Sequence, residues 1–254
     1  MTMATTALDF ANKVVLVTGG SRGLGKAMVM GFAERGADLV IASRKLDACE
    51  AVARDVRALG RRALPVAAHV GQWEDLDRLV GAAYLEFGRV DVLINNAGMS
   101  PLAPSLLGVS EALFDKVVDV NFKGPFRLAT LIGSRMAAAD GGSIINISSV
   151  GAVLPSPYFG VYSGAKAALN AVSIALAMEY APKVRVNVIS PGGFATDVSG
   201  DWAQDPAVLN NIMLKRLGRP EEIVSTALYL ASDQASFTTG ANIRVDGGCL
   251  AVKS

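Results

Sequence analysis

A tyrosine, a lysine and a serine in the second half of the chain have the types and spacing to move a proton. They are Ser149, Tyr162 and Lys166, with the tyrosine and lysine in the run Tyr162-Ser163-Gly164-Ala165-Lys166. On a helix, Tyr162 and Lys166 would lie on the same face. An ammonium beside a phenol favours the phenolate, which lowers the tyrosine pKa from its free value of about 10. We therefore predict that Tyr162 exchanges protons near neutral pH.

This spacing alone is weak evidence, because tyrosine packs in many cores and lysine lays its methylene chain over them. The chain has 254 residues, 51% of them hydrophobic, which is enough for one large α/β domain. Its 24 Lys and Arg nearly balance 23 Asp and Glu, so the net charge gives no sign of nucleic-acid or membrane partners.

Histidine and cysteine usage narrows the chemistry further. The single histidine, His69, excludes a multi-histidine metal site, and we expect no metal. Cys49 and Cys249 lie far apart, which disfavours a disulfide framework and fits a reducing compartment. We expect no signal peptide, because residues 1–11 lack a basic start followed by an apolar run, and we expect a cytoplasmic protein.

A glycine-rich loop near the start is placed to bind phosphate. The apolar run Val14–Val17 is typical of a strand buried on both faces of a parallel sheet. The loop Thr18-Gly19-Gly20-Ser21-Arg22-Gly23-Leu24-Gly25 follows, and a helical pattern then extends to Arg35. Glycines let the backbone approach a phosphate, and the helix N-terminus supplies free N–H donors. This context favours a nucleotide site over an ordinary glycine turn.

The end of the second expected strand, 39–42, indicates which dinucleotide is bound. In dinucleotide folds an acidic residue there binds the ribose 2′-hydroxyl, whereas this chain has Ser43-Arg44-Lys45. Arg44 can pair with a 2′-phosphate, and Arg22 could approach it from the glycine loop. Unless both arginines are simply solvated, NADP(H) is the preferred cofactor and NAD(H) remains possible.

Strands and helices alternate through the rest of the chain without a linker or repeat. Further strands are expected at 63–68, 91–94, 142–148, 184–190 and 243–245, and helices at 47–59, 74–87, 110–136 and 221–231. The pattern predicts an α/β fold over residues 1–254, a single doubly wound (Rossmann) parallel seven-stranded sheet with helices on both faces. The irregular stretch at about 194–219 is expected to be a substrate lid.

Taken in order, these motifs resemble the short-chain dehydrogenase/reductase family over about residues 9–249. The matching residues are Thr18, Gly19, Gly23 and Gly25, then Asn95-Asn96-Ala97-Gly98, Asn121, Ser149, Tyr162, Lys166, Asn187, Pro191-Gly192 and Thr196. Each motif is weak by itself, but their joint occurrence at the family's spacing is specific.

The resemblance implies a role for each residue. Tyr162 would be the general acid/base, Lys166 would lower its pKa and bind the nicotinamide ribose, and Ser149 would hydrogen-bond the substrate oxygen. Asn121 would hold a water in a proton relay, and Thr196 with the backbone near Ile189 would meet the carboxamide. The implied cofactor contacts are Gly19, Ser21, Arg22, Gly23, Leu24, Gly25, Ser43, Arg44, His69, Val70, Asn96, Ala97, Gly98, Tyr162, Lys166, Pro191, Gly192, Phe194 and Thr196.

One position departs from the family pattern. The family usually has an aspartate after the third strand, where it contacts the adenine amino group, and His69 occupies that place here. The Val70 backbone can still contact the adenine. The departure therefore puts one adenine contact in question and not the binding of the cofactor. His69 is otherwise expected to be structural.

The leading hypothesis is an NADP(H)-dependent carbonyl reductase or alcohol dehydrogenase that acts on a small molecule as a homotetramer. The tetramer follows from the resemblance and from the small-residue helix 164–177. Expected substrate contacts are Met99, Ser149, Pro155, Tyr158, Gly193 and Trp202, with Phe194 as a further pocket wall, and these predict a mostly apolar substrate.

Two alternatives remain open. One is a 3-oxoacyl-thioester reductase that docks an acyl carrier protein, although residues 136–140 lack the basic cluster that an acidic carrier would need. The other is a dinucleotide-binding regulator without turnover, which could afford to lose Ser149, Tyr162 or Lys166.

Overall fold

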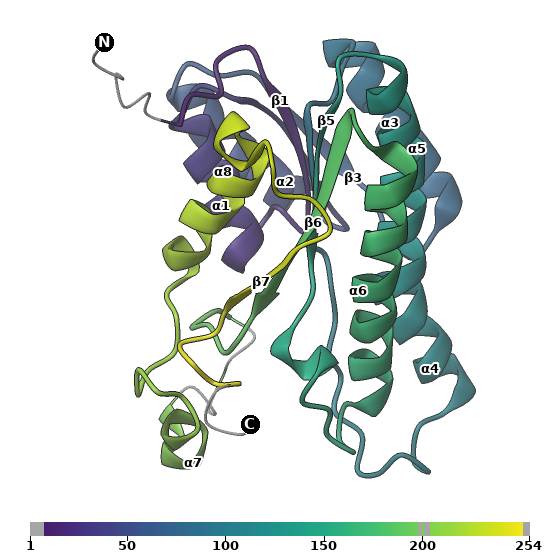
Figure 1. Ribbon diagram of the computed structural model, residues 1–254, viewed down its shortest axis with the longest axis vertical. Helices are drawn as coiled ribbons and strands as arrows, with labels where there is room; N and C mark the ends of the chain where they lie inside the picture. Colours follow the sequence, from purple (N-terminus) through teal and green to yellow (C-terminus); the bar gives the residue numbers. More distant parts are fainter. Residues whose placement is uncertain (1–7, 198–199, 201–203, 251–254) are drawn as a thin grey trace.

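A single parallel sheet organises the part of the chain that the computed structural model describes, residues 8–197, 200 and 204–250 (Figure 1). Its seven strands lie in the order β3-β2-β1-β4-β5-β6-β7 and all neighbouring pairs are parallel. The strands are β1 Val14–Thr18, β2 Asp38–Ser43, β3 Ala63–Ala67, β4 Val92–Asn95, β5 Gly142–Ile147, β6 Val184–Pro191 and β7 Asn242–Val245. The predicted doubly wound sheet is confirmed.

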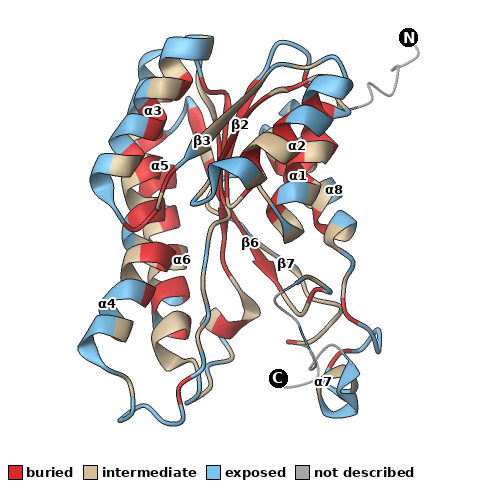
Figure 2. Ribbon diagram, turned by 180° about the vertical axis from the view of Figure 1, so that it is seen from behind, coloured by how far each residue is buried: buried red, intermediate tan, exposed pale blue. Residues whose placement is uncertain are grey.

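Two groups of helices cover the sheet, one on each face (Figures 1 and 2). On one face lie α1 Gly23–Ala33, α2 Leu46–Ala58 and α8 Val224–Ala231, and on the other α3 Trp73–Phe87, α4 Glu111–Val118, α5 Gly124–Ala138 and α6 Gly160–Tyr180. Each face has its own hydrophobic cluster, centred on Phe32 in one and on Ile132 in the other. β1 is buried along its whole length because both of its faces pack against side chains from these clusters.

The strand order reverses direction at the boundary between β1 and β4. The chain builds β1, β2 and β3 outward on one side, and β4 then returns to pair with β1 on the other. In such sheets a crevice for ligands forms outside the carboxyl ends of the strands at this switch point. The glycine loop after β1 and the asparagine loop after β4 therefore meet there.

The structure differs from the expected helices in two places. The helix expected over 110–136 is interrupted by a π-helical turn, η1 Asp119–Lys123, which contains Asn121. The Asn121 side chain donates to the Val117 carbonyl of its own helix, a local contact that competes with regular helical bonding. The expected helix 221–231 begins as a 3₁₀ turn, η4 Pro220–Ile223, and becomes α-helical only at Val224.

By length and composition, α6 could cross a membrane. It lies instead against the sheet and α5, with Leu169 and Leu176 buried in that contact. A core helix of an α/β sheet explains the same apolar composition.

Candidate active site

The loops after β1 and β4 are joined by side-chain hydrogen bonds. The Thr18 hydroxyl accepts from the backbone N–H groups of Asn96 at 3.0 Å and Ala97 at 3.1 Å. The Asn96 amide donates to the carbonyls of Thr18 at 2.9 Å and Gly19 at 3.3 Å. These bonds fix two of the predicted cofactor loops relative to each other at the switch point.

The glycine loop has the shape of a phosphate cradle. Gly19 has a φ of +64°, and a Cβ there would lie 2.8 Å from the Asn96 amide nitrogen. A Cβ on Gly25 would collide with the Gly19 carbonyl oxygen. Helix α1 begins at Gly23, and its N-cap residue Arg22 makes no side-chain capping bond, so no cap competes for the N–H donors of the first turn. The residues present therefore fit a dinucleotide pyrophosphate.

Two arginines, Arg44 after the end of β2 and Arg22 in the glycine loop, present their cations to solvent. Arg44 and Arg22 are exposed, and neither guanidinium forms a hydrogen bond or ion pair with another described residue. The Ser43 hydroxyl donates to the Lys45 carbonyl at 3.2 Å and lies 3.0 Å from the Cys49 sulfur, which holds the start of this turn. This arrangement suits a 2′-phosphate, because its charge would meet unpaired guanidinium groups.

His69 is held in the turn before α3. Its backbone N–H donates to the Asp75 carboxylate at 2.8 Å, and its Nδ1 accepts from the Gly71 N–H at 3.1 Å. Both contacts stabilise the turn, which agrees with the expected structural role. Neither bond tests whether His69 or Val70 contacts the adenine, so that contact stays a prediction.

Strand β5 and helix α6 bring Ser149, Tyr162 and Lys166 together. The Ser149 hydroxyl accepts from the Gly151 N–H at 3.0 Å and hydrogen-bonds the Tyr162 phenol. The Lys166 ammonium lies 5.9 Å from the centre of the Tyr162 ring and donates to the Ile147 carbonyl at 2.7 Å. The three side chains predicted from spacing thus share one site.

The predicted direction of the Tyr162 pKa was wrong for the cofactor-free protein. Burial raises the pKa of Tyr162 above its ordinary value, and the hydrogen bond to Ser149 opposes this only in part. Burial also lowers the pKa of Lys166 to about 8. The ammonium is directed at a backbone carbonyl rather than at the phenol oxygen, so the expected stabilisation of the phenolate is missing.

Asn121 connects the π-turn to the loop after β4. Its amide donates to the carbonyls of Met99 at 2.8 Å and Val117 at 2.9 Å, and its oxygen accepts from the Met99 N–H at 3.2 Å. Both amide hydrogens are therefore used within the protein. The contacts give Asn121 a positioning role in this structure, and its role in a water relay stays a prediction.

The structure separates the expected substrate residues. Met99 is half-buried, whereas Pro155 and Tyr158 are exposed at the mouth of the site. Phe194 does not line the site as expected: its ring is 7% exposed and covers Gly218, within the cluster on the α1 side. Gly193 contacts Gly218 through its backbone, and Trp202 lies outside the described residues.

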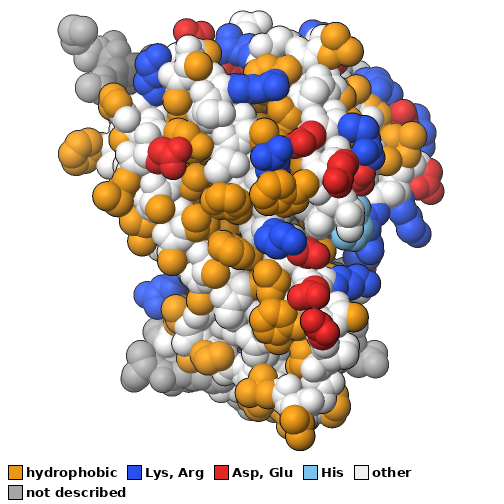
Figure 3. All heavy atoms as spheres, turned by 90° about the vertical axis from the view of Figure 1, so that its right-hand side faces the viewer, with side chains coloured by type: hydrophobic (Ala, Val, Ile, Leu, Met, Phe, Trp, Pro, Cys, Tyr) orange, Lys and Arg blue, Asp and Glu red, His pale blue; other side chains and the backbone are white. Residues whose placement is uncertain are grey.

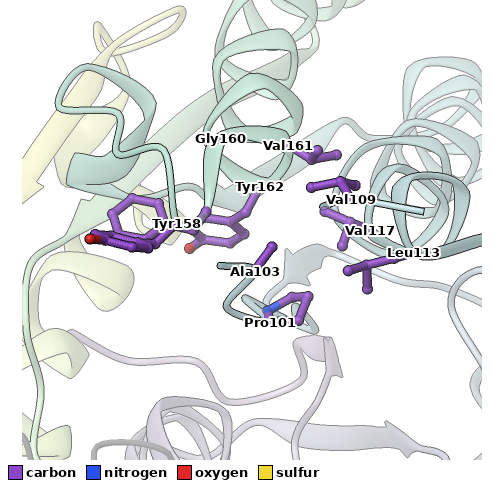
Figure 4. A pocket seen from close by; sticks show the side chains of 10 residues that line it. Pro101, Ala103, Val109, Leu113, Val117, Tyr158, Gly160, Val161 and Tyr162 are labelled. Atoms are coloured by element: carbon purple, nitrogen blue, oxygen red, sulfur yellow. The ribbon is translucent and has the colours of Figure 1, made fainter. Parts of the chain in front are cut away.

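Sequence reasoning missed a small apolar cavity beside Tyr162 (Figure 4). Its walls include Ala103 and Val109 from the segment after the asparagine loop, and Leu113 and Val117 from α4. Tyr158 and Tyr162 lie next to each other on its other side. The signal available in the sequence was the charge-free run 99–110, which follows directly after a predicted cofactor loop.

Comparisons with known proteins cover nearly the whole chain. The family model described as Enoyl-(Acyl carrier protein) reductase matches residues 19–249. Dehydrogenase/reductase SDR family member 4 of Bos taurus is 38% identical over 244 residues, 94% of this chain and 88% of that protein. A short-chain type dehydrogenase/reductase from Mycobacterium marinum has a TM-score of 0.90 at 33% identity, covering 95% of this chain and 97% of its own. A Beutenbergia cavernae protein solved with bound NADP has a TM-score of 0.90 at 32% identity, covering 96% and 99%.

The buried Lys166 should make stability depend on alkaline pH. Its pKa is about 8 in the folded protein against 10.5 for the free side chain. At pH values between these two pKa values, Lys166 keeps its proton in the unfolded chain but has released it in the folded protein. The free energy of unfolding therefore rises with pH. Relative to Lys166→Met, the parent should gain up to about 3 kcal/mol between pH 8 and 10.5.

Chemical denaturation of the cofactor-free protein at several pH values measures this gain. Lys13→Met, which changes an exposed lysine, is the matched control and should follow the pH dependence of the parent. If Lys166→Met also runs parallel to the parent, the ammonium does not titrate in the folded protein as described.

Proposed function

We propose that this chain, which belongs to the short-chain dehydrogenase/reductase family, is an NADP(H)-dependent enzyme that interconverts a carbonyl compound and its secondary alcohol. The family membership makes it an oxidoreductase. The observation that carries the finer proposal is the meeting of Ser149, Tyr162 and Lys166 next to the glycine cradle.

The nicotinamide, when bound, supplies or accepts the hydride. Tyr162 gives a proton to the substrate oxygen in reduction and takes it back in oxidation. Since burial raises its pKa, the neutral phenol is the resident form in the cofactor-free protein, and this form can donate a proton. Ser149 already bonds the phenol and holds the substrate oxygen beside it. The Lys166 ammonium donates to the Ile147 carbonyl, which fixes its orientation, and Lys166 binds the nicotinamide ribose.

The preference for NADP(H) rests on the end of β2. Arg44 and Arg22 offer two cations without hydrogen-bond or ion-pair partners among the described residues, beside the Ser43 hydroxyl, which bonds the Lys45 carbonyl. The residues directly after β2, Arg44 and Lys45, include no carboxylate to bind a ribose 2′-hydroxyl. The NADP bound to the Beutenbergia cavernae relative supports the same choice.

A second candidate is the reduction of a 3-oxoacyl thioester on an acyl carrier protein. The matching family model is described as an enoyl-(acyl carrier protein) reductase, which shares the acyl-carrier-protein substrate with this candidate but reduces a carbon–carbon double bond instead of a 3-oxo group. The end of α5 does not exclude it: Asp140 is exposed there, but Lys183 donates to the Ala139 carbonyl at 3.0 Å and Arg89 lies 3.9 Å from Asp140, so cations absent from the run 136–140 itself do lie beside this helix end. NADPH oxidation with acetoacetyl thioesters, diketones, quinones and aldehydes, assayed side by side, separates the two candidates, and a chain that turns over none of them would be a regulator.

We further propose a cytoplasmic homotetramer. Helix α6 leaves a stripe of small and apolar residues exposed: Gly164, Ala167, Ala171, Ile174, Ala175 and Met178. Ile174 is 52% exposed and Met178 is 77% exposed. Figure 3 shows hydrophobic side chains gathered on the face that α3 to α6 form. Contact with a second copy would remove this surface from water.

Tyr162→Phe should keep cofactor binding and lose at least about a hundredfold in kcat, because it removes only the hydroxyl that carries the proton. NADPH binding by fluorescence and turnover with an accepted carbonyl compound are the two measurements. Tyr84→Phe, which alters a tyrosine on α3 away from the site, is the control. Turnover of Tyr162→Phe within a few fold of the parent would remove this role.

Ser43→Asp combined with Arg44→Ala should reverse the cofactor preference toward NADH. The loss of one guanidinium and the repulsion from a new carboxylate should together change the ratio of kcat/KM for NADPH and NADH by about tenfold or more. Arg54→Ala, an exposed cation on α2, should leave the ratio unchanged. A parent that already prefers NADH would show that Arg44 is an ordinary surface residue.

Ala171→Glu should dissociate the tetramer, because it places a charge in the middle of the exposed α6 stripe. Light scattering at micromolar concentration measures the mass. Ala58→Glu at the exposed end of α2 is the matched control and should stay associated. A parent protein that is monomeric at this concentration contradicts the proposal.

A further inference from the structure

We propose that Glu222, which lies outside the site, is a positioning residue for the nicotinamide half of the cofactor site. It lies in the 3₁₀ turn η4 and reaches the cofactor site through Arg216, Arg219 and Gly218. This inference depends on the proposed function in one respect, which is that residues 191–196 contact the nicotinamide.

The Glu222 carboxylate uses both of its oxygens. It accepts from the two terminal nitrogens of Arg216 at 2.7 Å each, and from the Arg219 backbone N–H at 2.7 Å. The Arg219 guanidinium adds a longer bond of 3.3 Å. These contacts, the Arg216 bonds first, hold the pKa of Glu222 at about 2, so the carboxylate is ionised at every pH at which the folded protein would be assayed.

This ion pair is partly exposed, and isolated surface pairs contribute little to stability. The geometry of this pair differs from that of an isolated surface pair. Bidentate bonding fixes the orientation of the Arg216 guanidinium, and the bond from the Arg219 N–H fixes the position of the main chain. Arg216 and Arg219 stand on either side of Gly218. The carboxylate therefore restrains the path of the backbone through Gly218 rather than merely pairing two side chains.

Gly218 is hydrogen-bonded to the segment that precedes Thr196. Its N–H donates to the Gly193 carbonyl at 3.0 Å, and its carbonyl accepts from the Ala195 N–H at 2.8 Å. A Cβ at Gly218 would lie 2.7 Å from the Phe194 ring, so the two backbones are in close contact. The position of Gly218 consequently sets the position of residues 193–195.

The residues flanking this bridge are those proposed to meet the nicotinamide end. Gly192 precedes it, with its N–H bonded to the Val245 carbonyl, and Thr196 follows it next to Gly23. The adenine end is built from the loops after β1 and β2, and it adjoins this segment where Gly23 faces Thr196. Release of Gly218 should therefore displace one half of the cofactor site and leave the other half intact.

This separation gives a binding test that needs no substrate. Glu222→Ala should weaken NADPH binding by about tenfold and leave the affinity for 2′,5′-ADP, which is the adenine half alone, within about twofold of the parent. Arg216→Ala should act in the same direction, and Glu222→Gln, which keeps the acceptor oxygen for the Arg219 N–H, should lie between Glu222→Ala and the parent. Glu221→Ala changes the exposed neighbour in the same turn and is the matched control.

The outcomes are distinct. Unchanged NADPH affinity in Glu222→Ala and Arg216→Ala overturns the inference, and so does equal weakening of NADPH and 2′,5′-ADP, which would indicate general destabilisation. Melting temperatures identify a variant that does not fold, in which case the remaining variants decide. If the parent binds NADH and ADP instead, the NADP(H) proposal fails, and the same comparison with those ligands still decides the role of Glu222.

Discussion

A buried pair of asparagines on adjacent strands holds the two halves of the site together. Asn95 at the end of β4 donates to the Asn146 oxygen on β5 at 2.8 Å and to the Pro125 carbonyl of α5 at 3.2 Å. Asn146 in turn donates to Ser173 of α6 at 2.8 Å. Since unpaired polar groups are costly in a core, these bonds select one arrangement of both helices on the sheet. The helix that carries Tyr162 and Lys166 is thereby fixed beside the switch point.

The site itself is built at a cost in stability. The Lys166 ammonium lies in the core and donates to the Ile147 backbone carbonyl, and burial disfavours its charge. Burial disfavours the phenolate of Tyr162 by the same physics. Two neighbouring groups with perturbed pKa values are typical of functional sites rather than of structural pairs. In the cofactor-free protein, however, the Tyr162 phenol holds its proton more tightly than a free tyrosine does.

The sequence allowed the strands and the site residues to be predicted, because both are local signals. β1 and β4 are short apolar runs that end at a glycine and an asparagine motif, and the spacing of Tyr162 and Lys166 places them on one helix face. The errors arose where a distant residue decides. In the π-turn, Asn121 bonds Met99 of a distant loop as well as Val117 of its own helix. The Phe194 ring packs against the distant Gly218, and the Tyr162 pKa depends on how deeply the ring is buried.

Different interactions form the two ends of the proposed cofactor site, and they determine what a substitution at each end would alter. At the adenine end, Arg22 and Arg44 are exposed charges, whose effect is screened by salt and can be altered without disturbing the fold. At the nicotinamide end, Gly193, Ala195 and Gly218 are joined through backbone hydrogen bonds, and a side chain at Gly218 would have no room. Substitutions at the first end should therefore alter which dinucleotide is preferred. Changes at the second end must move the backbone of residues 193–195, which we propose to face the nicotinamide, so they should affect every dinucleotide alike.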